Sequence, residues 1–177
     1  MFVMGIDPGL SATGYGLVEG GHPPTARRAG VIRTDPGKTM AVRLHELFMG
    51  LTQVIEESHP DAVAVETVFT NRNLQTAIAV GRASGVALLT AARAGLPVSE
   101  YAPTAVKSAI TGDGAATKTQ IQQMVARLLR LTDPPKPADA ADALAIALCH
   151  LRAAPLELSL PQQGGSPAKT GRGDPFR

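Results

Sequence analysis

Residues 2–34 alternate short apolar runs with turn residues, a pattern that is typical of β-strands. The first apolar run ends at Asp7-Pro8-Gly9, which is a strong turn signal, and a second break falls at Pro23-Pro24. Three strands are predicted, at residues 2–6, 14–18 and 26–34. Because they follow one another closely, the pattern favours a meander of three strands.

Beyond residue 34 the apolar period lengthens to that of amphipathic helices separated by short strands. Helices are predicted at residues 39–58, 73–93 and 138–151, with another after the capping box Thr117-x-x-Gln120, and strands at 61–65 and 97–101. Three strands followed by alternating β and α units predict an α/β domain, in which a five-stranded mixed β-sheet is flanked by α-helices. We expect this domain to cover residues 1–152, and the polar residues 153–177 to form a flexible C-terminal tail.

Composition changes this picture little. Apolar residues make up 44% of the chain and charged residues 18%, and the net charge of +2 is too small to identify a nucleic-acid binder by itself. If the protein binds DNA, its basic groups must gather on one face. The single cysteine, Cys149, cannot form an internal disulfide, and we expect no secretory signal and no membrane span, because no apolar run comes near the roughly 20 residues required. These features favour a cytoplasmic protein.

Four acidic residues are the candidate chemistry. Asp7 and Glu66 each end an apolar strand, and Asp139 and Asp142 lie one helical turn apart on one face. If the first and fourth strands are parallel neighbours, Asp7 and Glu66 face the same edge of the sheet, and the last helix needs only to pack beside it. Such a cluster would require compensating cations. Mg²⁺ suits carboxylate oxygens, and two ions would support in-line hydrolysis of a phosphodiester.

Each acid also has a plain structural reading. Asp7 could simply form a turn, Glu66 could be a solvated strand end, and Asp139 could favour the helix macrodipole. Asp142 is harder to explain in this way, because it lies in the apolar segment Ala-Ala-Asp-Ala-Leu-Ala-Ile, where an uncompensated carboxylate would be costly.

With their neighbours, these residues resemble the RuvC family of Holliday-junction resolvases over roughly residues 1–152. The matching segments are Gly5-Ile-Asp-Pro-Gly-x-x-x-Thr13-Gly-Tyr-Gly16, Val65-Glu66-x-Val-Phe69, Ala83-x-Gly85-Val, Lys107, Thr111-Gly-x-Gly114-x-Ala-x-Lys118-x-Gln and Asp139-Ala-Ala-Asp142-Ala-Leu-Ala-Ile. The resemblance implies an RNase H-like fold and a homodimer that cuts two opposed strands of a four-way DNA junction. It also implies two Mg²⁺ ions per site, for which Mn²⁺ can substitute, and the RuvA–RuvB branch-migration complex as a partner.

The resemblance assigns roles to individual residues. The catalytic, metal-binding acids fall on Asp7, Glu66, Asp139 and Asp142. Basic DNA contacts fall on Lys107 and Lys118, and an exposed aromatic near the junction centre falls on Phe69. Arg72 and Asn73, in the same polar stretch, are further candidate DNA contacts. For Phe69 the competing interpretation is a core side chain, and for the two lysines it is an ordinary solvated surface position.

Two questions stay open at this point. Gly81 and Gly85, on one face of the helix at 73–93, could mark a dimer interface or close packing against the protein's own sheet. Two other functions also compete with the nuclease: an actin-like ATPase lobe, suggested by Asp7-Pro-Gly-x-x-x-Thr-Gly, and a non-catalytic junction-binding module. The ATPase requires two related lobes and a longer chain, and the intact acids argue against a module that has lost catalysis.

Overall fold

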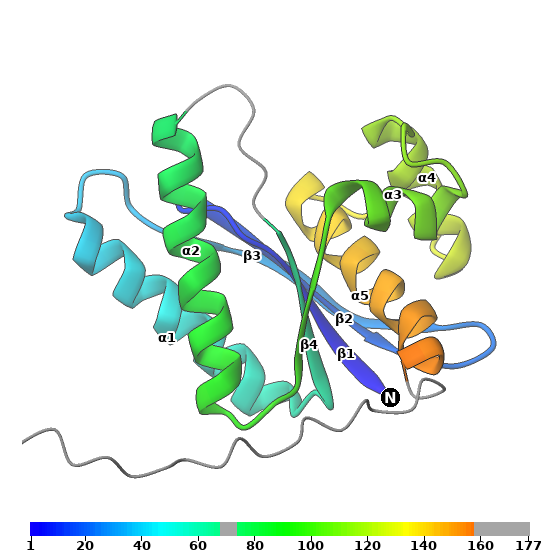
Figure 1. The fold of residues 1–177 in the computed structure, drawn as a ribbon, viewed down its shortest axis with the longest axis horizontal. Coiled ribbons are helices and arrows are strands. Elements are labelled where there is room, and N and C mark those ends of the chain that lie inside the picture. The colour runs from blue at the N-terminus through cyan, green and yellow to red at the C-terminus, as the bar shows by residue number, and fades with distance from the viewer. Residues whose placement is uncertain (68–73, 158–177) are drawn as a thin grey trace, which may run out of the picture.

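The computed structural model describes residues 1–67 and 74–157. In these residues a five-stranded sheet lies between two layers of helices (Figure 1). The strands are β1 (Phe2–Asp7), β2 (Ala12–Glu19), β3 (Thr25–Arg33), β4 (Ala62–Glu66) and β5 (Val98–Tyr101). The helices are α1 (Met40–Ser58), α2 (Leu74–Arg93), α3 (Pro103–Thr111), α4 (Lys118–Leu128) and α5 (Ala138–Glu157). The predicted α/β class and five-stranded mixed sheet are confirmed.

The sheet has the order β3-β2-β1-β4-β5. β1 is antiparallel to β2, which in turn is antiparallel to β3, so the predicted meander is confirmed. On its other side β1 runs parallel to β4, and β4 runs parallel to β5. The central strand β1 therefore has its carboxyl end at the same edge of the sheet as β4 and β5.

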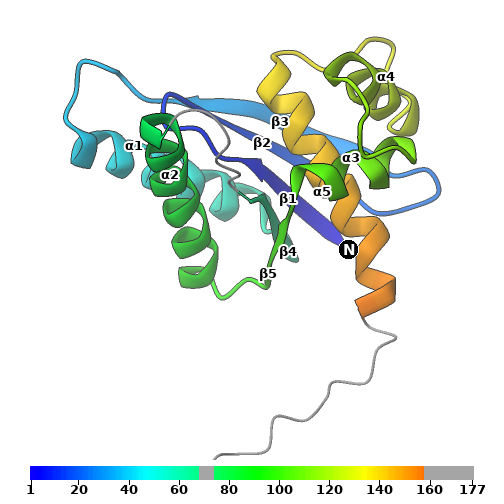
Figure 2. The same ribbon diagram turned by 45° about the horizontal axis from the view of Figure 1, so that its top comes forward.

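Alternation along the strands divides the core into two halves. Val3 and Val18 lie on the face covered by α3, α4 and α5, whereas Met4 and Leu17 lie on the face covered by α1 and α2 (Figures 1 and 2). All four of these side chains are buried. Because both faces of the central strands are covered, functional side chains have room to gather only at an edge of the sheet.

Two helices differ from the expectation. Helix α3 was not among the predicted helices. It begins at Pro103, and its C-cap is Gly112, which has a left-handed backbone with φ of 81°. Gly112 is therefore needed for this helix end, where other residues would be strained. Helix α5 extends to Glu157, beyond the predicted end at Leu151. The expected flexible tail thus falls mainly on residues 158–177, which lie outside the described part of the chain.

Helix α2 buries one side and exposes the other. Ala83, Ala87 and Ala91 are fully buried against the sheet and α1. On the opposite side, a Cβ added at Gly81 or Gly85 would meet no atom within 4 Å. These glycines therefore do not pack against the protein's own sheet, and that interpretation of them is wrong.

By length and composition alone, α2 is apolar enough to cross a membrane, although no run of this kind was expected from the sequence. Its fully buried alanine side nevertheless belongs to the hydrophobic core that α2 forms with α1 and the sheet. The remaining face of α2 is exposed, and on it Leu74, Ile78 and Leu89 are 72%, 46% and 56% exposed.

Candidate active site

Asp7 and Glu66 lie side by side at the carboxyl edge of the sheet. Ile6 pairs with Val65 in the parallel ladder between β1 and β4, so the acid that follows each of them projects from the same edge. Both acids are half-buried. The conditional expectation that these strands are parallel neighbours is confirmed, and it is this pairing that brings together two residues 59 positions apart.

Glycines in the sheet allow α5 to bring two further acids to this edge. A Cβ at Gly14 would lie 2.1 Å from the backbone oxygen of Asp139, and one at Gly5 would lie 2.1 Å from that of Ala143. Only a residue without a side chain permits so close an approach. Helix α5 therefore lies directly on β1 and β2, with Asp139 in its first turn beside Gly14 and Asp142 one turn further along.

The structure places three of the acids in one group. Asp7, Asp139 and Asp142 each offer a carboxylate oxygen, and these oxygens all lie within 4.8 Å of one another. Burial raises the pKa of Asp7 to about 6, and the charges of Asp142 and then Asp139 add to this shift. Three oxygen ligands from half-buried carboxylates that repel one another form a donor set that suits a hard divalent cation such as Mg²⁺.

Glu66 stands beside this group rather than within it. Its side chain lines a cavity of about 270 Å³ together with Asp142, Lys107 and Lys118. Burial raises the pKa of Glu66 to about 7, with further contributions from the charges of Asp7 and Asp142. The charges of Asp7 and Asp142 therefore act on Glu66, and its role as the fourth acid of the site stays a prediction.

Both predicted lysines lie at the site. Lys118 Nζ donates a 2.6 Å hydrogen bond to Asp142 Oδ2, and this bond raises the pKa of Lys118. Lys107, half-buried on α3, lowers the pKa of Glu66 through its charge. Lys118 opens α4, where the capping box between Thr117 and Gln120 is present as predicted. Both lysines therefore lie beside the acids, although Lys118 is itself exposed, and their contacts with DNA stay predictions.

Three other predicted DNA contacts, Phe69, Arg72 and Asn73, lie outside the described residues. They lie three to seven positions after Glu66 in the chain. Their roles stay predictions.

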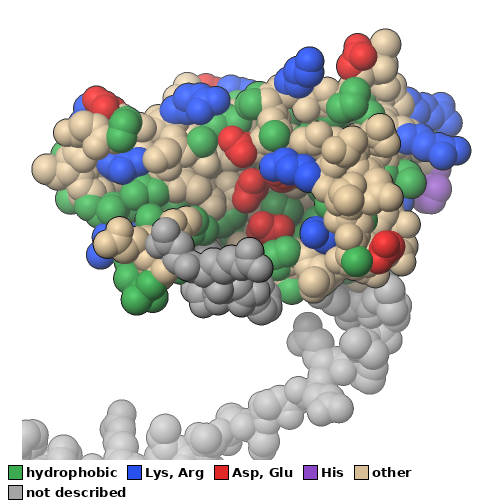
Figure 3. Space-filling model, turned by 90° about the horizontal axis from the view of Figure 1, so that it is seen from above, with side chains coloured by type: hydrophobic (Ala, Val, Ile, Leu, Met, Phe, Trp, Pro, Cys, Tyr) green, Lys and Arg blue, Asp and Glu red, His purple; other side chains and the backbone are tan. Residues whose placement is uncertain are grey.

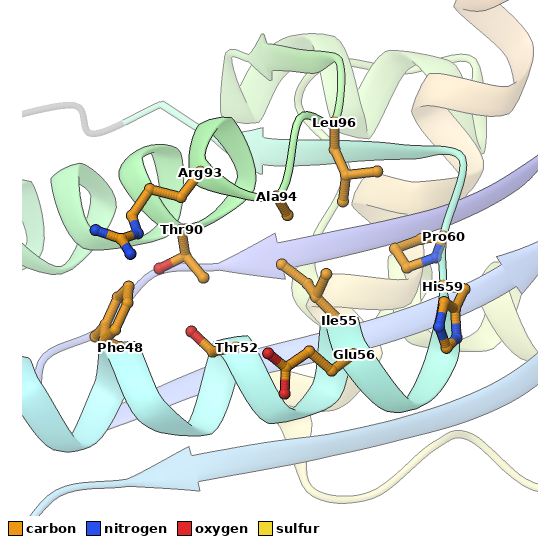
Figure 4. Close-up of a pocket in the computed structure, with 10 residues that line it drawn as sticks. All are labelled: Phe48, Thr52, Ile55, Glu56, His59, Pro60, Thr90, Arg93, Ala94 and Leu96. Carbon is orange, nitrogen blue, oxygen red and sulfur yellow. The ribbon is translucent and has the colours of Figure 1, made fainter.

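A larger cavity, of about 510 Å³, lies between α1 and α2 and is separate from the acids (Figure 4). It is lined by Phe48, Thr52, Thr90 and Arg93, with His59 and Pro60 at its border. His59 and Pro60 precede β4, so this cavity lies toward the amino end of that strand, whereas Glu66 is at its carboxyl end. The cavity does not belong to the candidate active site.

The structure also shows site features that the sequence interpretation missed. The ion pair between Lys118 and Asp142 joins residues 24 positions apart, and no local pattern indicates it. Near Asp7, Thr13 Oγ1 donates to the backbone oxygen of Gly9 at 2.6 Å and shapes the turn between β1 and β2. The motif from Gly5 to Gly16 contained this threonine, but its spacing alone did not indicate the bond.

Known proteins share both the sequence and the fold of this chain. Residues 3–150 match the family model "Crossover junction endodeoxyribonuclease RuvC". A protein of that name from Salinispora arenicola is 53% identical over 153 residues, covering 85% of this chain and 87% of the relative. Another from Streptomyces avermitilis is 48% identical over 174 residues, covering 97% of this chain and 99% of the relative.

A solved structure gives the same result. It is that of Thermus thermophilus RuvC in complex with a Holliday junction substrate, and it superposes with a TM-score of 0.84 at 38% identity. The match covers 89% of this chain and 96% of the other. The RNase H-like fold is thereby confirmed, and the actin-like ATPase lobe is excluded as the family. The chain belongs to the RuvC family of crossover junction endodeoxyribonucleases.

Proposed function

We propose that this Holliday-junction endonuclease holds two Mg²⁺ ions with Asp7, Glu66, Asp139 and Asp142, and that it cuts two opposed strands as a homodimer. The observation that carries the proposal is the group of carboxylate oxygens within 4.8 Å at the edge of the sheet, with Glu66 beside it. Divalent ions held by these acids would stabilise the attacking and leaving oxygens of an in-line phosphodiester hydrolysis. Mn²⁺ has similar ligand preferences and is the expected substitute.

The protein's own residues bind and orient the DNA around the acids. Lys107 and Lys118 line the same cavity as Glu66 and Asp142, which supports a role for their ammonium groups in contacts with backbone phosphates near the cut. Phe69, Arg72 and Asn73 follow Glu66 closely in the chain. We assign Phe69 to stacking on or wedging between bases, and Arg72 and Asn73 to phosphate or base contacts.

The exposed face of α2 supports the homodimer. Leu74, Ile78 and Leu89 fall on the same helical face as Gly81 and Gly85, opposite the buried alanines. A second copy would bury this stripe, and the glycines would let two helices approach closely. Two symmetrical cuts are most simply made by a two-fold dimer with one site in each subunit. We further propose action in the cytoplasm, together with the RuvA–RuvB branch-migration complex.

The test is cleavage of a synthetic four-way junction in Mg²⁺, Ca²⁺ or EDTA. We expect junction binding in Ca²⁺ without cutting, and symmetrical cutting in Mg²⁺. Asp7→Asn should keep junction binding in Ca²⁺ and lose cutting in Mg²⁺, because it removes one carboxylate of the metal-binding group. The exposed Asp133→Asn is the matched control and should cut normally. Normal turnover by Asp7→Asn would contradict the ligand assignment, and binding without cutting in every metal would support a non-catalytic module.

A further inference from the structure

Arg43, in the first turn of α1, is held by hydroxyl groups rather than by a carboxylate. Its Nε donates to Thr34 Oγ1 at 2.9 Å, and its Nη2 donates to Ser11 Oγ at 2.7 Å. Thr34 is buried, and its hydroxyl donates in turn to the backbone oxygen of Leu10 at 2.6 Å. These bonds fix the plane of the guanidinium against the turn that follows Asp7.

The charge of this guanidinium is not compensated within the described residues. A guanidinium carries five N–H groups, and these bonds use two of them. No carboxylate in the described part of the chain forms an ion pair with Arg43, and Glu46, one turn along α1, is paired with Lys38. By contrast, the exposed Arg27 is paired with Glu19. A half-exposed guanidinium with fixed orientation and free donors is well suited to bind an oxyanion.

The position of Arg43 relates this free charge to the candidate active site. Ser11 lies in the turn between β1 and β2, four residues after Asp7. Helix α1, which carries Arg43, covers one face of the sheet, whereas Lys107 and Lys118 come from helices on the other face. On the molecular face seen from above in Figure 3, Lys and Arg side chains lie on both sides of a group of acidic ones.

We infer that Arg43, oriented by Ser11 and Thr34, binds a backbone phosphate of the DNA on the side of the acids opposite Lys107 and Lys118. The inference rests on the proposed function, because it requires a DNA strand at the acids. A strand whose scissile phosphate lies at the acids would then be held on both sides of the cut. Since phosphates carry no sequence information, the contact adds affinity and register but no base preference.

Salt dependence of junction binding distinguishes this contact from a purely structural role. Each phosphate that a protein neutralises contributes about 0.9 to the slope of log K against log [salt] on duplex DNA. In Ca²⁺, Arg43→Gln should therefore lower the slope by about 0.9 and weaken binding about tenfold at low salt. Arg43→Lys keeps the charge and should keep the slope. The matched control is Arg27→Gln, which removes one positive charge at the far end of the sheet and should leave the slope unchanged.

A second measurement locates the phosphate without relying on the stability of a variant. Methylphosphonates that replace single phosphates on either side of the cut should include one position that weakens binding by wild-type protein. That position should have no further effect on Arg43→Gln, whereas the positions contacted by Lys107 or Lys118 should weaken both proteins equally. If Arg43→Gln loses affinity with an unchanged slope, or if every position weakens both proteins equally, the inference is wrong. If wild-type protein does not bind the junction, the proposed function itself fails.

Discussion

Lys118 donates a 2.6 Å hydrogen bond to Asp142, and thereby places an ammonium group beside the acids that we assign to metal binding. The bond raises the pKa of Lys118. Burial raises the pKa of both Asp7 and Glu66, and the positive charge of Lys118 offsets part of that rise. Lys118 thus compensates part of the negative charge in the protein without metal. Because a metal ion would bind the same Asp142 carboxylate, Lys118 and the ion compete for it.

This competition predicts that Lys118→Met lowers the stability of the metal-free protein but increases the stabilisation that added Mg²⁺ provides. Without metal, the variant should be less stable than wild type by about 1 kcal/mol, since Lys118 is 56% exposed and solvent weakens the pair. With Mg²⁺, its melting temperature should rise more than that of wild type, because no ammonium group competes for Asp142. Differential scanning fluorimetry over a Mg²⁺ titration measures both effects.

The matched variant for this test is Lys118→Arg, which keeps the positive charge beside Asp142. It should resemble wild type in its stability without metal and in its response to Mg²⁺. Equal Mg²⁺ responses of Lys118→Met and wild type would show that the lysine and the metal do not share Asp142.

The acids also predict how stability without metal depends on pH. The pKa of Asp7 rises from 3.8 to about 6, and that of Glu66 from 4.5 to about 7. The unfolded chain therefore releases these protons at a lower pH than the folded protein does. The contribution of these two acids to stability should therefore be highest below about pH 4, fall as the pH rises through about 7, and then level off. A shift of about two pKa units corresponds to about 3 kcal/mol.

Asp7→Asn removes the loss of stability that comes from ionising Asp7 in the folded protein. In EDTA at about pH 8, the variant should be more stable than wild type by up to about 3 kcal/mol, whereas near pH 4 the two should agree. Urea unfolding at both pH values measures the difference, with the exposed Asp133→Asn as the control. A loss of stability at pH 8 would mean that Asp7 forms favourable contacts that outweigh its burial and the repulsion by Asp142 and Asp139.

The parts of this site differ in how far the sequence could predict them. Asp7 and Glu66 end two apolar strands, so a parallel pairing suffices to bring them together, and Asp139 and Asp142 share a face by helical spacing alone. The hydrogen bond from Lys118 depends on how α4 packs relative to α5. The contacts of Arg43 join segments around residues 11, 34 and 43, which meet only in the folded protein. Local periodicity contains no signal for either arrangement.

The close contact between α5 and the sheet predicts that Gly14→Ala impairs the site more than the fold. Its Cβ would lie 2.1 Å from the backbone oxygen of Asp139, so the first turn of α5 must move away from β2. Overpacking of this kind typically costs about 1–3 kcal/mol. Because Asp139 moves with the turn, Mg²⁺-dependent cutting should fall by well over tenfold even where the variant remains folded. Junction cleavage, measured beside circular dichroism, tests this.

Gly21→Ala is a suitable control for that experiment. Gly21 lies in the turn between β2 and β3, and the atom nearest to its Cβ would be the backbone oxygen of Pro23, at 3.1 Å. This variant should cut at nearly the wild-type rate. If Gly14→Ala also cuts normally, then the close approach of α5 does not determine the position of Asp139.

The exposed face of α2 predicts that Ile78→Glu separates the proposed homodimer without unfolding the subunit. Ile78 is 46% exposed in the single chain, so a charge there costs little until a second copy buries it. Val42→Glu on α1 is the matched control, because Val42 is 43% exposed and lies outside α2. Sedimentation velocity should find a monomer for Ile78→Glu and a dimer for Val42→Glu, both with melting temperatures near that of wild type.

The monomer should also lose the coordination of its two cuts on a four-way junction, since each site would then act alone. A dimeric Ile78→Glu, or an equally dimeric Gly85→Leu, would place the interface elsewhere and leave the apolar stripe of α2 without its proposed partner.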